Sequence, residues 1–263
     1  MLTEFTYESF LIWWGNFFWP FVRIGALLAV FPVLSSHSVP TRVKLFVTIM
    51  LTVAVMPSIK FTSPIDPFTQ EGVVLAFTQV GIGLAMGLVF VVIFQSFTLA
   101  GQMIANAMGL GFSSMVDPAT GVNSPVVSQF FTVLVSLIFV VMNGHLLVIS
   151  MLADSFEAMP LTGSFLSASS LHSLALWGSP LVIWGVMVAL PILTALLMVN
   201  IALGVISRAA PTLNVFSIGF VVTILGGLAL IWWLLPLLGE QFVMFMHQAL
   251  DFVQTLRLTQ VAS

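Results

Sequence analysis

The sequence has no cysteine and very little charge. Only 6% of its 263 residues are Asp, Glu, Lys or Arg, whereas a soluble domain carries about a quarter. Without cysteine, disulfides and thiolate metal sites are excluded. The net charge of −3 comes with no basic cluster, which argues against nucleic acid as a partner. With 60% hydrophobic residues and a mean hydropathy of +1.18, the composition indicates an integral membrane protein.

Six apolar segments of the sequence are long enough to cross a bilayer, which takes about 20 residues each. They run from about Phe10 to Leu34, on to about Met56, from Val73 to Met108, from Val126 to Met151, from Leu174 to Ile206 and from Val215 to Leu238. Pro20 and Pro32 are expected to bend the first segment, and Pro180 and Pro191 to interrupt the fifth. We therefore expect an all-α integral membrane fold of about six hydrophobic, bent or broken helices. An amphipathic tail from Glu240 to Arg257 is expected to follow them.

The few charges in the loops predict an orientation. Arg42 and Lys44 flank the first loop and Arg208 lies in the fifth, whereas the second and fourth loops are acidic on balance. The positive-inside rule then places the first, third and fifth loops in the cytoplasm and the N-terminus outside.

Small residues recur at helical spacing along the third segment. Gly83 and Gly87 are four residues apart. Gly81 precedes them and Ala85 lies between them. Such a stripe lets helix backbones approach closely in a membrane. A nucleotide-binding glycine motif is rejected, because no strand or βαβ context surrounds these glycines.

A polar stretch from Gly101 to Pro125 interrupts the apolar sequence. Gly109 and Gly111 disfavour helix there, and Pro118 stops it. In a chain this apolar, an irregular polar loop must be buried in protein, line a wet cavity or lie outside the bilayer.

Arg23 is an ionisable residue in the middle of the first apolar segment. Such a charge is costly in a membrane and needs a partner. The expected partner is a helix C-terminus, a set of backbone carbonyls or a carboxylate of another chain. Within this chain, Asp117 is the best acidic candidate. A structural role in assembly is favoured over ion transport.

The other polar residues do not form a catalytic constellation. Asp117 can cap its own turn before Pro118, and only Arg208 and His145 could join it in a proton relay. No companions at ligand spacing accompany His145, and no nucleophile motif is present. We therefore expect that the protein is not an enzyme and that it binds no metal and no cofactor.

Three methionines accompany the polar stretch: Met103, Met108 and Met115. With Phe112 they could form a deformable apolar seal around a pore, because thioether side chains repack easily and an apolar constriction excludes ions. Ordinary helix packing is the alternative, and spacing alone favours it.

Several unusual strings occur in order along almost the whole chain. They are FVRIGALLAVFP, SVPTRVKL, AGQMIANAMGLGFSSMVDPATGVNSPVVSQF, FVVMNGH and ALPILTALLMVNIALGVISRAAPTLNVFSIGF. This set resembles the FliR/SctT family, the membrane subunits of the flagellar and type III secretion export gate. The Ser-rich stretch from Ser164 to Ser173 and the C-terminal tail match least well.

The resemblance implies a multi-pass protein of the bacterial inner membrane and the flagellar basal body. It would assemble with FliP and FliQ into a hetero-oligomeric gate, with FlhB around it, that conducts unfolded flagellar proteins. It implies helical hairpins in two parts, a FliP-like part (about 1–172) fused to a FliQ-like hairpin and tail (about 173–263). It also implies that the assembled helices lie largely above the membrane plane, whereas hydropathy alone would place them within the lipid bilayer.

The resemblance also assigns a role to the central loop, which plugs the closed pore. Carried onto this sequence, the plug comprises Phe112, Ser113, Ser114, Met115, Val116, Asp117, Pro118, Ala119, Thr120, Gly121, Val122, Asn123 and Ser124. Met103 and Met108 then lie near the constriction, and Arg23 and Arg208 are structural charges.

The alternative is an independent proton-coupled secondary transporter that uses Arg23, Asp117 and Arg208. The sequence speaks against it, because coupled transporters need acidic groups at the membrane midplane and the only such acid lies in a loop.

Overall fold

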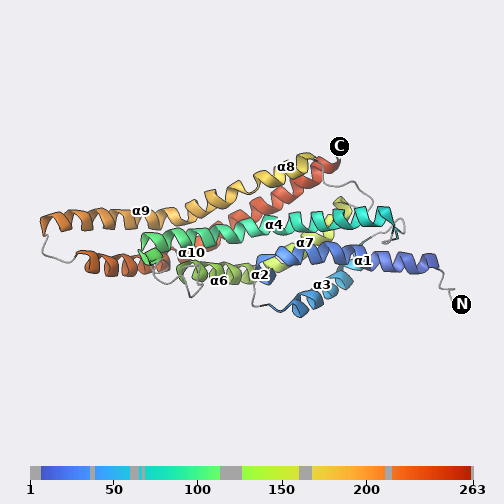
Figure 1. Ribbon diagram of the computed structural model, residues 1–263, viewed down its shortest axis with the longest axis horizontal. Coiled ribbons are helices and arrows are strands. Elements are labelled where there is room, and N and C mark those ends of the chain that lie inside the picture. The colour runs from blue at the N-terminus through green and yellow to red at the C-terminus, as the bar shows by residue number, and fades with distance from the viewer. Residues whose placement is uncertain are drawn as a thin grey trace. The chain divides into compact units, whose positions relative to one another are not determined.

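Helices make up all the regular structure in the described part of the chain (Figure 1). The computed structural model describes residues 7–35, 39–59, 65–66, 69–112, 126–159, 168–210 and 215–261. Its elements are α1 (Tyr7–Val30), α2 (Pro32–Ser35), α3 (Thr41–Val55), η1 (Met56–Ser58), α4 (Gln70–Ala107), η2 (Leu110–Phe112), α6 (Val126–Val141), α7 (Gly144–Ala158), α8 (Ala168–Leu176), α9 (Ser179–Ala209) and α10 (Val215–Val261). The expected all-α membrane fold is confirmed.

Among the helices that the structure describes, fewer than the predicted six segments are long and apolar enough to span a membrane. In the described residues three stretches qualify, namely α4, α8 with α9, and Ile218–Thr255 of α10. The pair α6 and α7 counts as a fourth if it is one broken span. The second predicted segment forms α3, whose 15 residues reach about 22 Å, short of the bilayer's hydrocarbon core of about 30 Å.

Two predicted interruptions are wrong. Pro191 lies inside the continuous helix α9, and Pro180 lies in the first turn of that helix, where no backbone donor is needed. The break comes just before, at the turn Trp177–Gly178. The tail from Glu240 onward is also no separate element, because α10 continues through Pro236 for 47 residues. Its predicted apolar face is confirmed, since Phe242, Phe245, Met246, Ala249 and Val253 are all buried.

The chain divides into two compact units. Unit 1 comprises residues 1–91, 142–178 and 248–263, and unit 2 comprises residues 92–141 and 179–247. Both α4 and α10 contribute one part to each unit. This division follows contacts within the chain. The expected FliP-like and FliQ-like parts, divided near residue 172, stay a prediction, as does the orientation in the membrane.

In unit 1, α1 packs against α3 and against the first part of α4 (Figure 1). A Cβ atom on Gly83 would lie 2.8 Å from Ala26 Cβ and 3.1 Å from Leu27 N of α1. A Cβ on Gly87 would lie 2.9 Å from Leu27 O. The predicted small-residue stripe is therefore confirmed as the place where two helix backbones approach closely.

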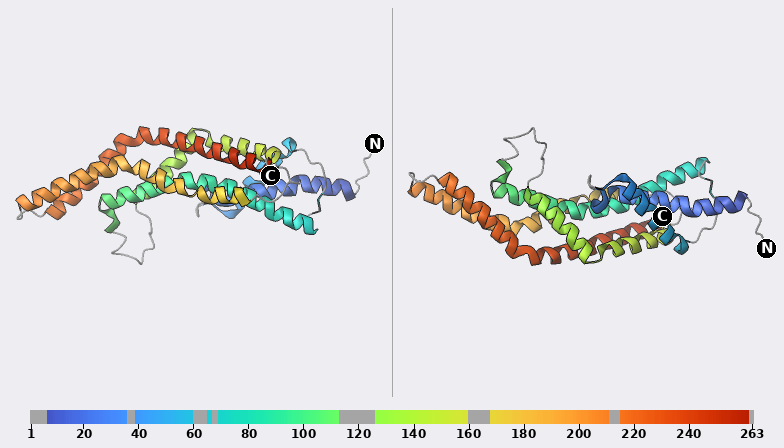
Figure 2. Two further views of the ribbon diagram at one scale, coloured as in Figure 1. Left: turned by 90° about the horizontal axis from the view of Figure 1, so that it is seen from above. Right: turned by 90° about the horizontal axis from the view of Figure 1, so that it is seen from below.

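In unit 2, α9 and the first part of α10 run antiparallel, side by side (Figures 1 and 2). Gly219 of α10 faces Leu203 of α9, whose Cδ1 would lie 3.2 Å from an added Cβ. Aromatic rings fill the interior, where Trp184 of α9 stacks on Phe245 of α10 with ring centroids 4.5 Å apart. Phe97 of α4 packs on the same Phe245 ring at 5.7 Å.

Candidate functional site

Arg23 is completely buried in unit 1 and all three of its guanidinium nitrogens are bonded. Its Nε donates to Gln79 Oε1 of α4 at 2.7 Å. One terminal nitrogen donates to the Ser155 carbonyl at 3.0 Å and to the Ser155 hydroxyl at 3.1 Å. The other donates to the Met159 carbonyl at 2.8 Å. The guanidinium carbon lies 4.2 Å from the centroid of the Phe156 ring.

The partners of Arg23 form the C-terminal end of a helix. Ser155 lies in the last turn of α7 and Met159 is the residue that caps it. Carbonyls at a helix C-terminus carry partial negative charge and can accept from donors outside the helix, although the Ser155 carbonyl also accepts from the Met159 amide at 2.9 Å. The guanidinium supplies donors to them in a fixed fork. Of the partner classes expected for Arg23, the structure therefore shows a helix C-terminus with its backbone carbonyls.

Gln79 and Ser155 were not among the residues singled out from the sequence. Gln79 is an amide within the apolar run of α4, and it is fully buried. A lone amide in such a run is costly unless bonded, so it was a usable signal for a buried partner. The carbonyls of Ser155 and Met159 carried no signal, because every residue has a backbone carbonyl.

The central polar stretch lies mostly outside the described residues. Ser113 to Ser124, including Met115 and Asp117, belong to the part that the structure leaves undescribed. Phe112 ends η2. The helix α4 ends at Ala107, and Gly109 follows with φ of +84°. The Gly109 amide donates to the Asn106 carbonyl at 3.1 Å, as in a glycine C-cap. The predicted end of the helix at these glycines is confirmed.

Met108 and Met103 have different surroundings. Met108 is completely buried, and its side chain packs on Gly227 of α10, while its carbonyl accepts a hydrogen bond from Thr223 Oγ1 at 3.2 Å. Met103 is half-buried. Only Met103 of this pair therefore presents side-chain surface outside the chain's own core.

A cavity of about 450 Å³ lies beside the end of α4, within unit 2. Its lining joins the end of α4 to α9 and α10: Asn106, Ala107, Gly109, Asn200, Leu203, Gly204, Ser207, Gly219, Phe220 and Thr223. None of these residues is charged, and no carboxylate or histidine is among them. The described lining of the cavity therefore offers amide and hydroxyl groups beside small and apolar residues.

Arg208 and His145 are neither in the described lining of this cavity nor among the described partners of Arg23. Arg208 is exposed in the last turn of α9, a favourable place for a cation. His145 is exposed in the first turn of α7. Among the described residues, no group of three or more His, Cys, Asp or Glu could hold a metal ion.

Comparison with known proteins gives the family. Residues 14–249 match the family described as bacterial export proteins, family 1. The chain belongs to this family. The matched range includes Arg23 with its partners and also Met103, Met108 and the cavity lining.

Several curated relatives are similar to this chain over most of their length. Flagellar biosynthetic protein FliR of Escherichia coli (strain K12) is 39% identical over 238 residues, which are 90% of this chain and 91% of that protein. FliR of Pectobacterium carotovorum is 38% identical over 95% of both chains. The surface presentation of antigens protein SpaR of Shigella flexneri is 27% identical over 77% of this chain and 78% of its own. The resemblance found in the sequence is thereby confirmed.

Proposed function

We propose that this chain is a structural pore subunit of the flagellar type III protein export gate in the bacterial inner membrane. The observation that carries the proposal is the match to bacterial export proteins over residues 14–249, with relatives named FliR that are 38–39% identical over at least 90% of both chains. In this function the chain assembles with FliP and FliQ, with FlhB around the complex. It forms part of the conduit for unfolded flagellar proteins and uses no cofactor.

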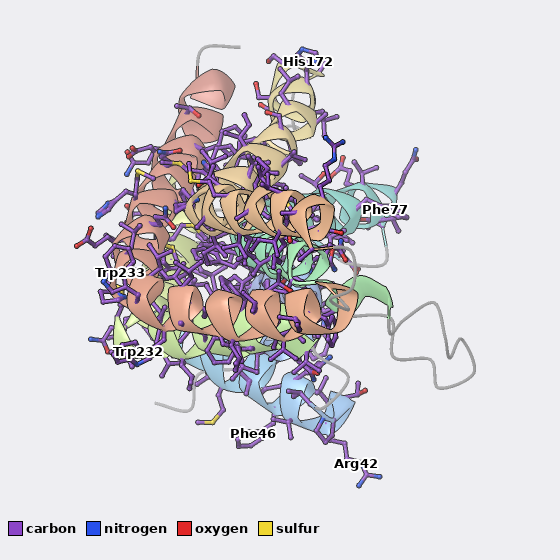
Figure 3. All side chains as sticks on the ribbon, turned by 90° about the vertical axis from the view of Figure 1, so that its left-hand side faces the viewer. Arg42, Phe46, Phe77, His172, Trp232 and Trp233 are labelled. Carbon is purple, nitrogen blue, oxygen red and sulfur yellow. The ribbon has the colours of Figure 1, made fainter. Side chains whose placement is uncertain are left out.

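The exposed apolar surface of α9 and α10 supports a subunit that is covered by partners or lipid. In the most apolar stretch of α10 only 17% of the residues are buried within the chain, against 67% for α4. Trp232 and Trp233 are 76% and 74% exposed and extend from α10 (Figure 3). Apolar surface of this size does not stay in water.

The short helix α3 supports the same conclusion, because it buries polar residues and exposes large apolar ones. Its buried polar residues are Thr48 and Thr52, whose hydroxyls bond to carbonyls of their own helix at 2.8 and 2.7 Å. Phe46 and Met50 are exposed instead, and Figure 3 shows Phe46 extending outward beside Arg42. An outward apolar face fits an apolar environment around the subunit.

We further propose that the loop from Phe112 to Ser124 is the plug of the closed gate and that Met103 contributes to the constriction. The support is the polar, glycine- and proline-containing sequence of this loop in an otherwise apolar chain. The half-buried position of Met103 on the last turns of α4, just before the loop, supports the second part. Met108 lies near the constriction but inside the core of unit 2.

The test of the plug is deletion of Phe112 to Ser124 in the assembled gate. The deletion should raise the ion conductance of membranes that contain the gate, because nothing then fills the conduit at rest. Size and subunit composition of the purified complex serve as the control for assembly. Unchanged conductance in a correctly assembled complex contradicts the plug.

Copurification tests the wider proposal. A gate subunit expressed with its neighbours should be isolated in a complex with other small membrane proteins. If the chain is instead stable alone and couples proton movement to the transport of a small solute, the result favours an independent transporter.

A further inference from the structure

The end of α4 is fixed to α10 by two contacts that involve one residue, Met108. Thr223 Oγ1 donates to the Met108 carbonyl at 3.2 Å, and it is also within 3.1 Å of the Phe220 carbonyl. The Met108 side chain lies over Gly227, so closely that an added Cβ on Gly227 would be 2.6 Å from Met108 Cγ and 2.7 Å from Sδ. One helical turn of α10 thus contacts both the backbone and the side chain of Met108.

These contacts lie at the C-terminal end of α4, where carbonyl groups have no backbone donor within the helix. The last carbonyls of a helix need donors from outside the helix. Met108 follows the last residue of α4, and its amide still bonds back to Ile104 at 2.9 Å. Its carbonyl is the acceptor that Thr223 satisfies. Because both groups are buried, loss of the hydroxyl leaves a buried acceptor without this donor.

Glycine at position 227 is required by space and not by backbone conformation. Its φ is not among the positive values, which in the described residues are found only at Gly109 and Asn143. The neighbouring Gly226 has nothing within 4 Å of an added Cβ. The two adjacent glycines of α10 therefore differ in their surroundings, because Met108 lies against the buried Gly227 and no atom lies near an added Cβ on the half-buried Gly226.

We infer that Thr223 and Gly227 are positioning residues that anchor the end of α4 through Met108 and thereby fix the point from which the central loop begins. This inference rests on the proposed function only where the loop acts as the plug. It gives Met108 a role inside the subunit, as the anchor, and leaves the apolar constriction to Met103. The η2 turn, Leu110–Phe112, follows the anchor directly, so its position depends on Met108.

The test compares Gly227→Ala with Gly226→Ala in the assembled gate. Both changes remove the same backbone freedom and add one methyl group, but only the first meets Met108. Amide hydrogen exchange of the peptide that covers Leu110–Phe112 should speed up in Gly227→Ala and stay unchanged in Gly226→Ala. Adding Met108→Ala to Gly227→Ala should restore part of the protection, because it removes the clashing side chain.

A second pair of variants tests the hydrogen bond. Thr223→Val keeps the shape and loses the donor, and it should also speed up exchange at Leu110–Phe112. Thr223→Ser keeps the hydroxyl and should not. Equal exchange in the two glycine variants, or in the Val and Ser variants, overturns the anchor.

The outcome is separable from that of the plug. If deletion of Phe112 to Ser124 leaves conductance unchanged while Gly227→Ala alone speeds up exchange, the plug fails and the anchor stands. If the deletion makes the gate leak while Gly226→Ala and Gly227→Ala exchange equally, the plug stands and the anchor is overturned.

Discussion

Gly101 of α4 lies directly against the backbone of Ser128 on α6. A Cβ on Gly101 would be 2.6 Å from Ser128 Cα and 3.1 Å from Ser128 N, so only glycine fits. Next to this contact, Ser128 Oγ donates to the Thr98 carbonyl at 2.9 Å, and the Thr98 and Thr132 hydroxyls are 2.9 Å apart. Small residues and short hydroxyl side chains together let these two helices pack in unit 2.

The first prediction concerns this close approach. Gly101→Ala should destabilise the protein, because the methyl group meets backbone atoms that cannot move aside; overpacking of this kind costs about 1–3 kcal/mol. Thermal unfolding of the purified protein in lipid nanodiscs measures the loss. Gly204→Ala is the matched control, since nothing lies within 4 Å of its added Cβ, and it should be neutral or slightly stabilising.

The second prediction concerns Arg23. Arg23→Leu should reduce the yield of assembled gate, because the Met159 carbonyl and the Gln79 side-chain oxygen lose the Arg23 donors inside unit 1 and the Ser155 carbonyl keeps only the Met159 amide. Lost hydrogen bonds to a charged group cost about 1.5–3 kcal/mol each. Arg42→Leu removes an exposed arginine and should assemble normally. Normal yield of the Arg23 variant with lost export would assign Arg23 to transport instead.

The third prediction concerns the break between α6 and α7. Asn143 is the one non-glycine residue with positive φ among those described, at 55°. Asn143→Gly should be tolerated, whereas Asn143→Val should lower the thermal midpoint, because β-branched residues disfavour the left-handed region. Equal midpoints for Gly and Val at position 143 would show that the left-handed turn does not control stability.

The fourth prediction separates the two methionines of α4. Met108→Ala should cost about 2–5 kcal/mol, the usual penalty of a core methionine truncation, because Met108 is fully buried. Met103→Ala should cost clearly less, since Met103 is half-buried. The unfolding midpoints of the two variants in the same nanodiscs decide this, and similar losses would contradict the difference in burial.

Sequence periodicity predicted the features that depend on neighbouring residues. The extent of α4, its end at Gly109 and the buried face of α10 around Phe245 follow from local spacing, and all three are confirmed. The close approach at Gly83 follows from the small-residue stripe.

Other features depend on contacts that no local pattern encodes. A proline in a helix often bends it, but neighbours in the fold decide whether the helix continues, as α9 does through Pro191. The sequence pattern likewise does not show which face of α3 is buried. The hydroxyls of Thr48 and Thr52 bond to carbonyls of their own helix, so these polar residues can be buried. The partners of Arg23 are backbone carbonyls, which residue identities do not reveal.

The separation of Arg23 from its partners along the chain has a consequence for biosynthesis. Ser155 and Met159 follow Arg23 by 132 and 136 residues. A ribosome makes α1 before α7, so the guanidinium has no complete set of acceptors until the chain has been translated through Met159. Until that point another solvent, such as water or a lipid headgroup, must accept its hydrogen bonds. Helix α1 therefore reaches its final environment only after α7 has been synthesised.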